Sequence, residues 1–334
     1  MGWTSNDLLK ATSRSFYLTL RVLPRAIRPQ ISLAYLLART TDTIADTELV
    51  SVQGRLDALE ALRRRILGTA SDALDFGRLA QGCALPAEKN LLERAEEALR
   101  LLEQLPEADR RLVREVLRVI MSGQELDLHR FAGAKAAPVA ALETEAELDD
   151  YTYRVAGCVG EFWTRTCRLH LFPDARLDED FLLRNSVRFG KGLQWVNILR
   201  DIPRDLRKGR CYLPRQSLAA AGLSPADLLS PGSQARFGPL YDQWLAGAES
   251  HLAAGWDYTN ALPSGQFRLR LACAWPILIG VRTLRRLRHE NVLDQSRRVK
   301  VTRPEIRALI GRSILLYPWP SAWRGQFGRE LNHP

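Results

Sequence analysis

The chain has 334 residues, of which 46% are hydrophobic and 26% charged, and its net charge is +10. This is the composition of an ordinary globular protein with enough apolar residues for a sizeable core. The positive charge favours polyanionic partners, namely nucleic acid, an anionic membrane or phosphorylated substrates.

Cysteines and targeting signals narrow the class of protein. Five cysteines are scattered without a CxxC pair, so neither a zinc site nor a disulfide framework is expected. The first ten residues lack the pattern of a signal peptide, and the longest uncharged apolar run, 271–281, is too short to span a bilayer. We therefore expect a cytoplasmic protein without a transmembrane helix, and peripheral contact with the inner face of the membrane is compatible with this.

Apolar residues recur at helical spacing along nearly the whole chain, and alternating strand patterns are missing. We predict a single-domain, all-α bundle around a central cavity, because bundles place ligand sites on the inward faces of opposed helices. The predicted helices cover residues 5–20, 26–48, 51–68, 87–104, 107–129, 144–172, 178–202, 223–229, 236–262, 266–289 and 303–316.

Two motifs of the same form, Asp42-Thr-Ile-Ala-Asp46 and Asp201-Ile-Pro-Arg-Asp205, each end an apolar helical run. Carboxylates four residues apart share one helix face, where they repel each other unless a cation compensates. Mg²⁺ prefers oxygen ligands and shares its shell between carboxylates and phosphates. The preceding helices look buried, and buried carboxylates must be paired or bind metal. Two facing helices are therefore predicted to hold a diphosphate through Mg²⁺, whereas either motif alone could be a solvated helix face.

Pro203 lies inside the second motif, where proline removes a helical hydrogen bond and clashes with the preceding turn. We expect the helix to kink or end there, so that Asp205 need not share a face with Asp201. This proline puts Asp205 in question as a metal ligand.

Glycines and aromatic residues are interleaved in the segment 149–163. Gly157 and Gly160 each cost a helix about 1 kcal/mol relative to alanine, so they mark either a close approach by a ligand or tight packing between helices. Tyr151 and Tyr153 add aromatic faces that can stabilise a cation.

Five segments, in this order, resemble the squalene/phytoene synthase family of head-to-head prenyl transferases from about residue 5 to 305. They are Ser13-Arg-Ser-Phe16, Tyr35-Leu-Leu-Ala-Arg39 with the first acidic motif, Tyr151-Thr-Tyr-Arg-Val-Ala-Gly157, Gln194 and Asn197 with Arg200-Asp201, and Gly209-Arg-Cys-Tyr-Leu-Pro214. The resemblance implies an all-α isoprenoid synthase fold with a central cavity. It also implies that two identical allylic diphosphates are joined through a cyclopropyl diphosphate.

The resemblance implies roles for individual residues. Mg²⁺ and diphosphate would be held by Asp42, Asp46, Asp201 and Asp205, with Asn197 as a further ligand. The side chains in contact with diphosphate would be Ser13, Arg14, Ser15, Arg39, Gln194, Asn197 and Arg200. Tyr151 matches a tyrosine at the reacting centre. These residue types suit the chemistry, because ionising an allylic diphosphate requires charge neutralisation and a carbocation must be kept from water.

The branch of the family is suggested by smaller features. Thr43 and the segment 273–284 resemble squalene synthases, whereas the segment 123–128 resembles the phytoene-forming branch. We expect squalene to be formed from farnesyl diphosphate, with NADPH reducing the intermediate. The alternatives are a phytoene or dehydrosqualene synthase, or a presqualene diphosphate synthase that stops at the intermediate.

We expect no Rossmann domain that could bind NADPH, because no GxGxxG follows a predicted strand. It would bind the basic stretch that contains Arg297, Arg298 and Lys300, for which a solvated loop is the alternative.

We predict a catalytic domain over 1–310 and a tail over 311–334. The tail is apolar, aromatic and basic, so it either docks on a membrane surface or packs onto the bundle. A basic helical nucleic-acid-binding protein is the rival class, but it leaves the carboxylate pairs unexplained and shows no known binding motif. We therefore expect no nucleic-acid partner, and a catalytically silent scaffold is the third interpretation. Prenyl chain length and oligomeric state stay open.

Overall fold

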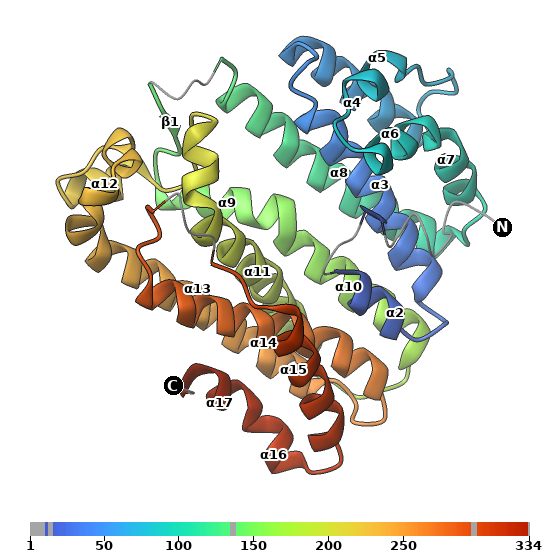
Figure 1. Cartoon of the computed structure of the whole chain (residues 1–334). Helices are drawn as coiled ribbons and strands as arrows, with labels where there is room; N and C mark the ends of the chain where they lie inside the picture. The colour runs from blue at the N-terminus through green and yellow to red at the C-terminus, as the bar shows by residue number, and fades with distance from the viewer. Residues whose placement is uncertain (1–10, 13–15, 134–137, 295–298, 333–334) are drawn as a thin grey trace. The chain divides into compact units, whose positions relative to one another are not determined.

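The computed structural model describes residues 11–12, 16–133, 138–294 and 299–332, and these residues are almost entirely helical (Figure 1). The prediction of an all-α chain is confirmed. Within the described ranges the only strands are β1 (Ala140–Ala141) and β2 (Arg210–Cys211), which form a two-residue parallel pair. The chain divides into two compact units, a first unit of residues 1–132 with 161–175 and a second unit of residues 133–160 with 176–334.

The first unit is built on α3 (Arg28–Asp46) and α8 (Glu107–Arg130), which pack against each other. On α3, Leu33, Leu36 and Leu37 are at most 2% exposed. Fully burying one leucine side chain contributes about 1.5–3 kcal/mol, so α3 is firmly held before it reaches the first acidic motif. The unit is completed by α2 (Phe16–Val22), α4 (Val52–Leu67), α5 (Gly77–Gly82), α6 (Pro86–Glu93), α7 (Ala95–Glu103) and residues 161–171 of α10 (Cys158–Leu171).

The second unit is built on α11 (Glu179–Arg207), which lies beside α13 (Gln234–Ala261) and α14 (Phe267–His289) (Figure 1). The predicted boundary between 310 and 311 falls inside α15. The other helical elements are α9 (Glu145–Thr152), the π-helical turn η1 (Tyr153–Gly157), α12 (Arg215–Ala220), the 3₁₀ turns η2 (Pro225–Leu229) and η3 (Pro231–Ser233), α15 (Arg303–Leu316), α16 (Pro320–Arg324) and α17 (Gln326–Asn332).

Some helix bounds differ from the prediction. The predicted helix 87–104 is two helices, α6 and α7, that are separated at Arg94. Four short helices, α5, α12, α16 and α17, were not predicted, because elements of five to seven residues contain too few repeats to show a period.

Glycines allow the segment from η1 to α10 to approach α11 closely. A Cβ atom on Gly160 would overlap the carbonyl oxygen of Ser186, and one on Gly190 would overlap the carbonyl oxygen of Ala156. A Cβ atom on Gly157 would lie 3.1–3.3 Å from side-chain carbons of neighbouring residues. These contacts decide between the two interpretations of Gly157 and Gly160 in favour of helix packing.

The C-terminal helices pack on the second unit. Trp323 is 2% exposed and stacks on Trp256 of α13 with ring centroids 5.3 Å apart. The indole N–H of Trp256 donates to the carbonyl of Arg324 at 3.0 Å, and that of Trp275 on α14 donates to Ser313 Oγ at 2.9 Å. The two possibilities for this segment were docking on a membrane surface and packing onto the bundle, and the structure shows that it packs onto the helices.

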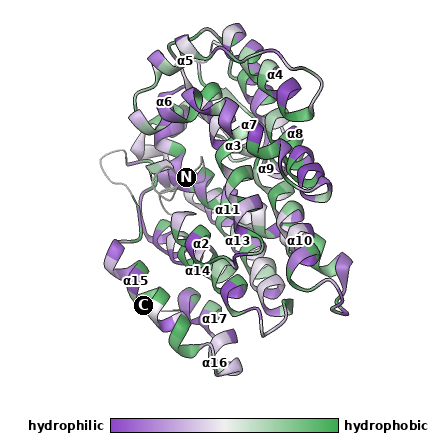
Figure 2. Cartoon of the chain, turned by 90° about the vertical axis from the view of Figure 1, so that its right-hand side faces the viewer, coloured by the Kyte–Doolittle hydropathy of each residue, from purple (hydrophilic) through white to green (hydrophobic). Residues whose placement is uncertain are grey.

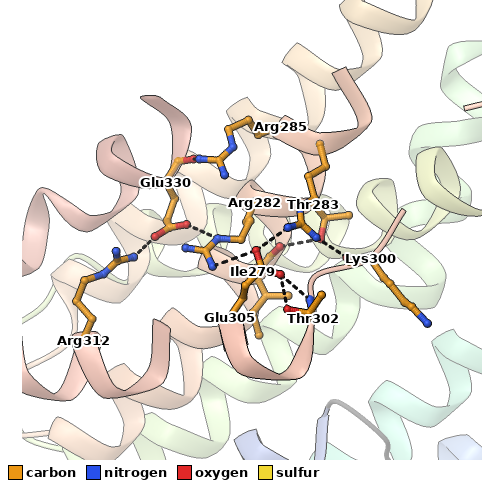
Figure 3. A network of polar contacts seen from close by, with 10 residues as sticks. Ile279, Arg282, Thr283, Arg285, Lys300, Thr302, Glu305, Arg312 and Glu330 are labelled. Carbon is orange, nitrogen blue, oxygen red and sulfur yellow. Dashed lines mark hydrogen bonds and ion pairs between the residues drawn. The ribbon is translucent and has the colours of Figure 1, made fainter. Parts of the chain in front are cut away.

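A buried carboxylate joins α17 to α14 and α15 (Figure 3). Glu330 is 0% exposed, and Arg282 Nε donates to its Oε2 at 2.8 Å. Its other oxygen, Oε1, is paired with Arg312, and Arg285 donates to its backbone carbonyl at 3.1 Å. A buried ion is tolerated only when such partners compensate its lost hydration.

We predict that Glu330→Gln lowers the free energy of unfolding by about 3 kcal/mol, because two guanidinium groups lose their counter-charge in a buried place. Chemical denaturation measures this loss. Arg329→Gln, at an exposed position of the same helix, is the control and should change stability by less than about 0.5 kcal/mol. Equal denaturation midpoints for Glu330→Gln and wild type would contradict the role of this network.

Candidate functional site

The first acidic motif forms the last turns of α3 in the first unit. Arg39 bridges two carboxylates, with Nη1 3.2 Å from Asp42 Oδ2 and Nη2 3.6 Å from Glu88 Oε1 on α6. Gln124 of α8 donates from Nε2 to Asp42 Oδ1 at 2.5 Å. Arg39 therefore supplies positive charge beside Asp42, and the predicted Mg²⁺ stays a prediction.

The aspartates of this motif are more accessible than predicted. The Asp42 side chain is 41% exposed and Asp46 is exposed, so the expectation of buried carboxylates is wrong here, although the apolar residues before them are buried. The surrounding protein nevertheless removes water from Asp42 and raises the pKa of its carboxyl, and the nearby Asp46 carboxylate acts in the same direction. Arg39 and Gln124 oppose this rise. An additional cation at the motif would favour the ionised form of Asp42.

Gln124 is a site residue that the sequence did not single out. Its Oε1 is buried and has no hydrogen-bond partner, while its Nε2 holds Asp42. An unpartnered buried carbonyl on a side chain that also holds the Asp42 carboxylate fits an oxygen-preferring cation such as Mg²⁺. The sequence gives no distinct signal for it, because charged residues are interleaved with apolar ones throughout 112–128.

The second acidic motif lies on α11 in the second unit. Arg200 holds Asp201 with two hydrogen bonds, from Nε to Oδ1 at 3.0 Å and from Nη2 to Oδ2 at 2.6 Å. The same Nη2 donates to Asn197 Oδ1 at 3.1 Å. Gln194 and Asp205 are partly buried on this helix. Carboxylate and amide oxygens are again the donors that suit Mg²⁺.

Neither motif has enough ligands of its own to enclose a metal ion. In the described part of the chain, no three His, Cys, Asp or Glu side chains converge as a metal site. Mg²⁺ commonly takes one or two carboxylates and completes its shell with water and phosphate oxygens. The residues of both motifs fit an ion of that kind.

The prediction that the helix could end at Pro203 is wrong, because α11 continues to Arg207. Proline at 203 cannot donate to the carbonyl of Leu199, four residues earlier. That carbonyl instead accepts a hydrogen bond of 3.1 Å from the hydroxyl of Tyr241 on α13. Tyr241 is 2% exposed. Burial raises the pKa of Tyr241, so the hydroxyl keeps its proton for this bond. Asp205 therefore remains one helical turn from Asp201.

Tyr151 is positioned by the segment that follows α11. Gly209 has φ +73°, which turns the chain out of the helix, and Cys211 of β2 then pairs with Ala141 of β1. The next residue, Tyr212, stacks on the Tyr151 ring with centroids 4.8 Å apart. Tyr151 is 7% exposed. The predicted segment 209–214 thus acts as a support for the Tyr151 ring.

Other predicted site residues are only partly described. Ser13, Arg14, Ser15, Arg297 and Arg298 lie outside the described residues. Lys300 is exposed, and its backbone carbonyl accepts a hydrogen bond from Arg286 at 2.5 Å. In the described ranges, no helix combines the length and the apolar character that a membrane span requires.

We predict that Tyr241→Phe lowers the free energy of unfolding by about 1–2 kcal/mol, because the buried Leu199 carbonyl loses its partner. In a Pro203→Ala background the restored N–H can donate to that carbonyl, so the same substitution should cost less. Denaturation of the four proteins in this double-mutant cycle measures the coupling. An equal cost of Tyr241→Phe in both backgrounds would refute the compensation.

Comparison with known proteins adds evidence independent of this geometry. A family model described as squalene/phytoene synthase matches residues 9–305. Presqualene diphosphate synthase of Zymomonas mobilis is 32% identical over 256 residues, which cover 76% of this chain and 74% of that protein. The bifunctional lycopene cyclase/phytoene synthase of Aspergillus oryzae is 28% identical over 264 residues, and these cover 77% of this chain but 43% of that longer protein.

The fold is also found among solved structures. A ligand complex of TcSQS aligns with a TM-score of 0.74 at 20% sequence identity, over 98% of this chain and 96% of that one. At that identity the likeness confirms the all-helical fold.

Proposed function

Because the chain belongs to the squalene/phytoene synthase family of prenyltransferases, we propose that it condenses two molecules of farnesyl diphosphate head to head into presqualene diphosphate. The observation that carries the proposal is that both acidic motifs have the same local construction. In each, an arginine holds the first aspartate, and a side-chain amide lies against that pair.

The proposed reaction requires an ionisation and a ring closure. The C1–O bond of one farnesyl diphosphate breaks, and diphosphate leaves with the electron pair. The allylic C1 cation adds to the double bond of the second molecule. Loss of one proton then closes a cyclopropane, so that two C–C bonds form. The products are presqualene diphosphate, diphosphate and H⁺, and no oxidant or reductant is consumed.

The residues of the motifs would bind the two diphosphates and stabilise the leaving group. Asp42 and Asp46 would hold Mg²⁺ on α3, and Asn197, Asp201 and Asp205 would hold it on α11. Bound Mg²⁺ neutralises charge on the oxygens of the departing diphosphate. Arg39 and Arg200, which pair with the first aspartates, would turn to phosphate oxygens when substrate arrives. Gln194 on α11 would also contact the diphosphate.

Tyr151 would act on the organic part of the reaction. Its ring could stabilise positive charge through its face, and its stacking on Tyr212 limits the positions that the ring can take. Ser13, Arg14 and Ser15 would add contacts to phosphate.

Reduction to squalene is a second candidate function. It rests on Thr43, because a threonine directly after the first aspartate of the motif resembles squalene synthases. The Thr43 hydroxyl donates to the Arg39 carbonyl at 2.8 Å. NADPH would then bind through Arg297, Arg298 and Lys300. The relative from Zymomonas mobilis is named for the intermediate alone, which favours release of presqualene diphosphate here.

Product analysis by mass spectrometry tests the proposal. The purified chain is incubated with farnesyl diphosphate and Mg²⁺, with and without NADPH, and the products are identified before and after phosphatase treatment. Presqualene diphosphate in both mixtures is the expected result. Squalene with NADPH would support the second candidate, and dehydrosqualene would contradict both. A parallel incubation contains the longer geranylgeranyl diphosphate instead. If only that mixture gives a product, the proposed substrate is wrong while the reaction class stands.

We predict that Asp205→Asn lowers turnover by about 10²-fold, a typical loss when one group that stabilises developing charge is removed, and that it raises the Mg²⁺ concentration needed for half-maximal rate. Asp180→Asn, at an exposed position near the start of α11, is the matched control and should behave as wild type. Normal turnover and Mg²⁺ dependence in Asp205→Asn would remove this residue from the ligand set.

A further inference from the structure

Exposed apolar side chains gather at one corner of the second unit. The described residues include seven strongly exposed large apolar side chains. Four of them lie at the start of α14 (Phe267), at the end of α15 (Ile314 and Leu315) and directly before α16 (Trp319). Leu315 is 65% exposed and Trp319 57%. Single exposed apolar residues are ordinary, whereas a group of four marks a surface with a partner. We call these four residues the apolar corner.

The apolar corner stands on a rigid base. The Tyr317 ring lies edge-on to Phe267 and to Trp323, with centroid distances of 4.6 and 4.9 Å. Its hydroxyl donates to the carbonyl of Ser264 at 2.6 Å. The Arg270 guanidinium lies 5.4 Å from the Tyr317 and Trp323 ring centroids. The residues between the exposed side chains are therefore fixed, so the corner is part of the folded surface.

Basic side chains continue the same face. On α15, positions 303, 307, 311, 314 and 315 are all exposed, and their spacing places them on one side of the helix. Arg303 and Arg307 thus precede Ile314 and Leu315 along one stripe. Figure 2 shows both hydrophilic and hydrophobic residues along α15 and α17. An apolar patch edged by arginines is complementary to a surface that is anionic outside and apolar beneath.

We propose that the apolar corner and the arginine stripe of α15 dock the protein on the surface of an anionic lipid bilayer. Leu315 and Trp319 enter the boundary between headgroups and acyl chains, and Arg303 and Arg307 lie against lipid phosphates. Apolar burial and electrostatic attraction together determine such interfacial binding. The docking does not depend on which reaction the protein catalyses.

The test uses the full chain and vesicles of phosphatidylcholine with or without phosphatidylglycerol. Wild type should sediment with the anionic vesicles and much less with neutral ones. Leu315→Ser/Trp319→Ser should weaken that binding by on the order of tenfold or more, from the apolar area it removes. Arg303→Gln/Arg307→Gln should weaken it at low salt and make it less salt-dependent. Deleting 314–334 is a poor test, because it removes the buried Trp323 and Glu330.

Leu49→Ser/Leu169→Ser is the matched control, since both leucines are exposed and lie in the first unit. It should bind vesicles as wild type does, and thermal unfolding verifies that every variant is folded. Unchanged vesicle binding by folded Leu315→Ser/Trp319→Ser would overturn the proposal. A second result would also overturn it. If wild type does not bind vesicles but self-associates in analytical ultracentrifugation, and Leu315→Ser/Trp319→Ser abolishes that self-association, the apolar corner binds a second copy of the chain.

Discussion

Repulsion between carboxylates on adjacent turns of one helix is the constraint from which both acidic motifs are built. In each motif a nearby arginine offsets this repulsion, Arg39 beside Asp42 and Arg200 beside Asp201. All four side chains are partly exposed, and ion pairs of that kind contribute about 0–1 kcal/mol each. Loss of either arginine–aspartate contact would therefore cost little stability.

The helix that carries the second motif contains residues that oppose local helix formation, and neighbouring helices compensate for each of them. Pro203 deprives the Leu199 carbonyl of its donor, and Tyr241 from α13 supplies one. Gly190 weakens the same helix but permits contact with the backbone at Ala156. The geometry at Asp201 and Asp205 is consequently determined by tertiary contacts more than by intrinsic helix propensity.

Periodicity was sufficient to predict the fold class, because a repeat of 3.6 residues persists through the long helices, and α15 has the predicted bounds 303–316. The acidic motifs follow from spacing along one chain segment. Gln124, Glu88 and Tyr241 do not, because each contacts a residue in or just before a motif from a helix at least 40 positions away in the sequence. Local patterns carry no information on which polar residue of α8 meets α3. For the same reason the exposure of Asp42 was misjudged, since the buried side chains before it face other helices.

The C-terminal segment shows why composition could not decide between packing and docking. Neighbouring residues there have opposite environments. Ser313 is buried against Trp275, while Ile314 beside it is 45% exposed. A window of sequence averages these two faces into one apolar and basic signal. The inward face, with Trp323 and Glu330, holds the segment on α13 and α14, and this attachment fixes the direction of the outward side chains. Because the segment is already fixed, binding through this face does not require a free tail to lose conformational entropy. A few exposed side chains are then enough for docking.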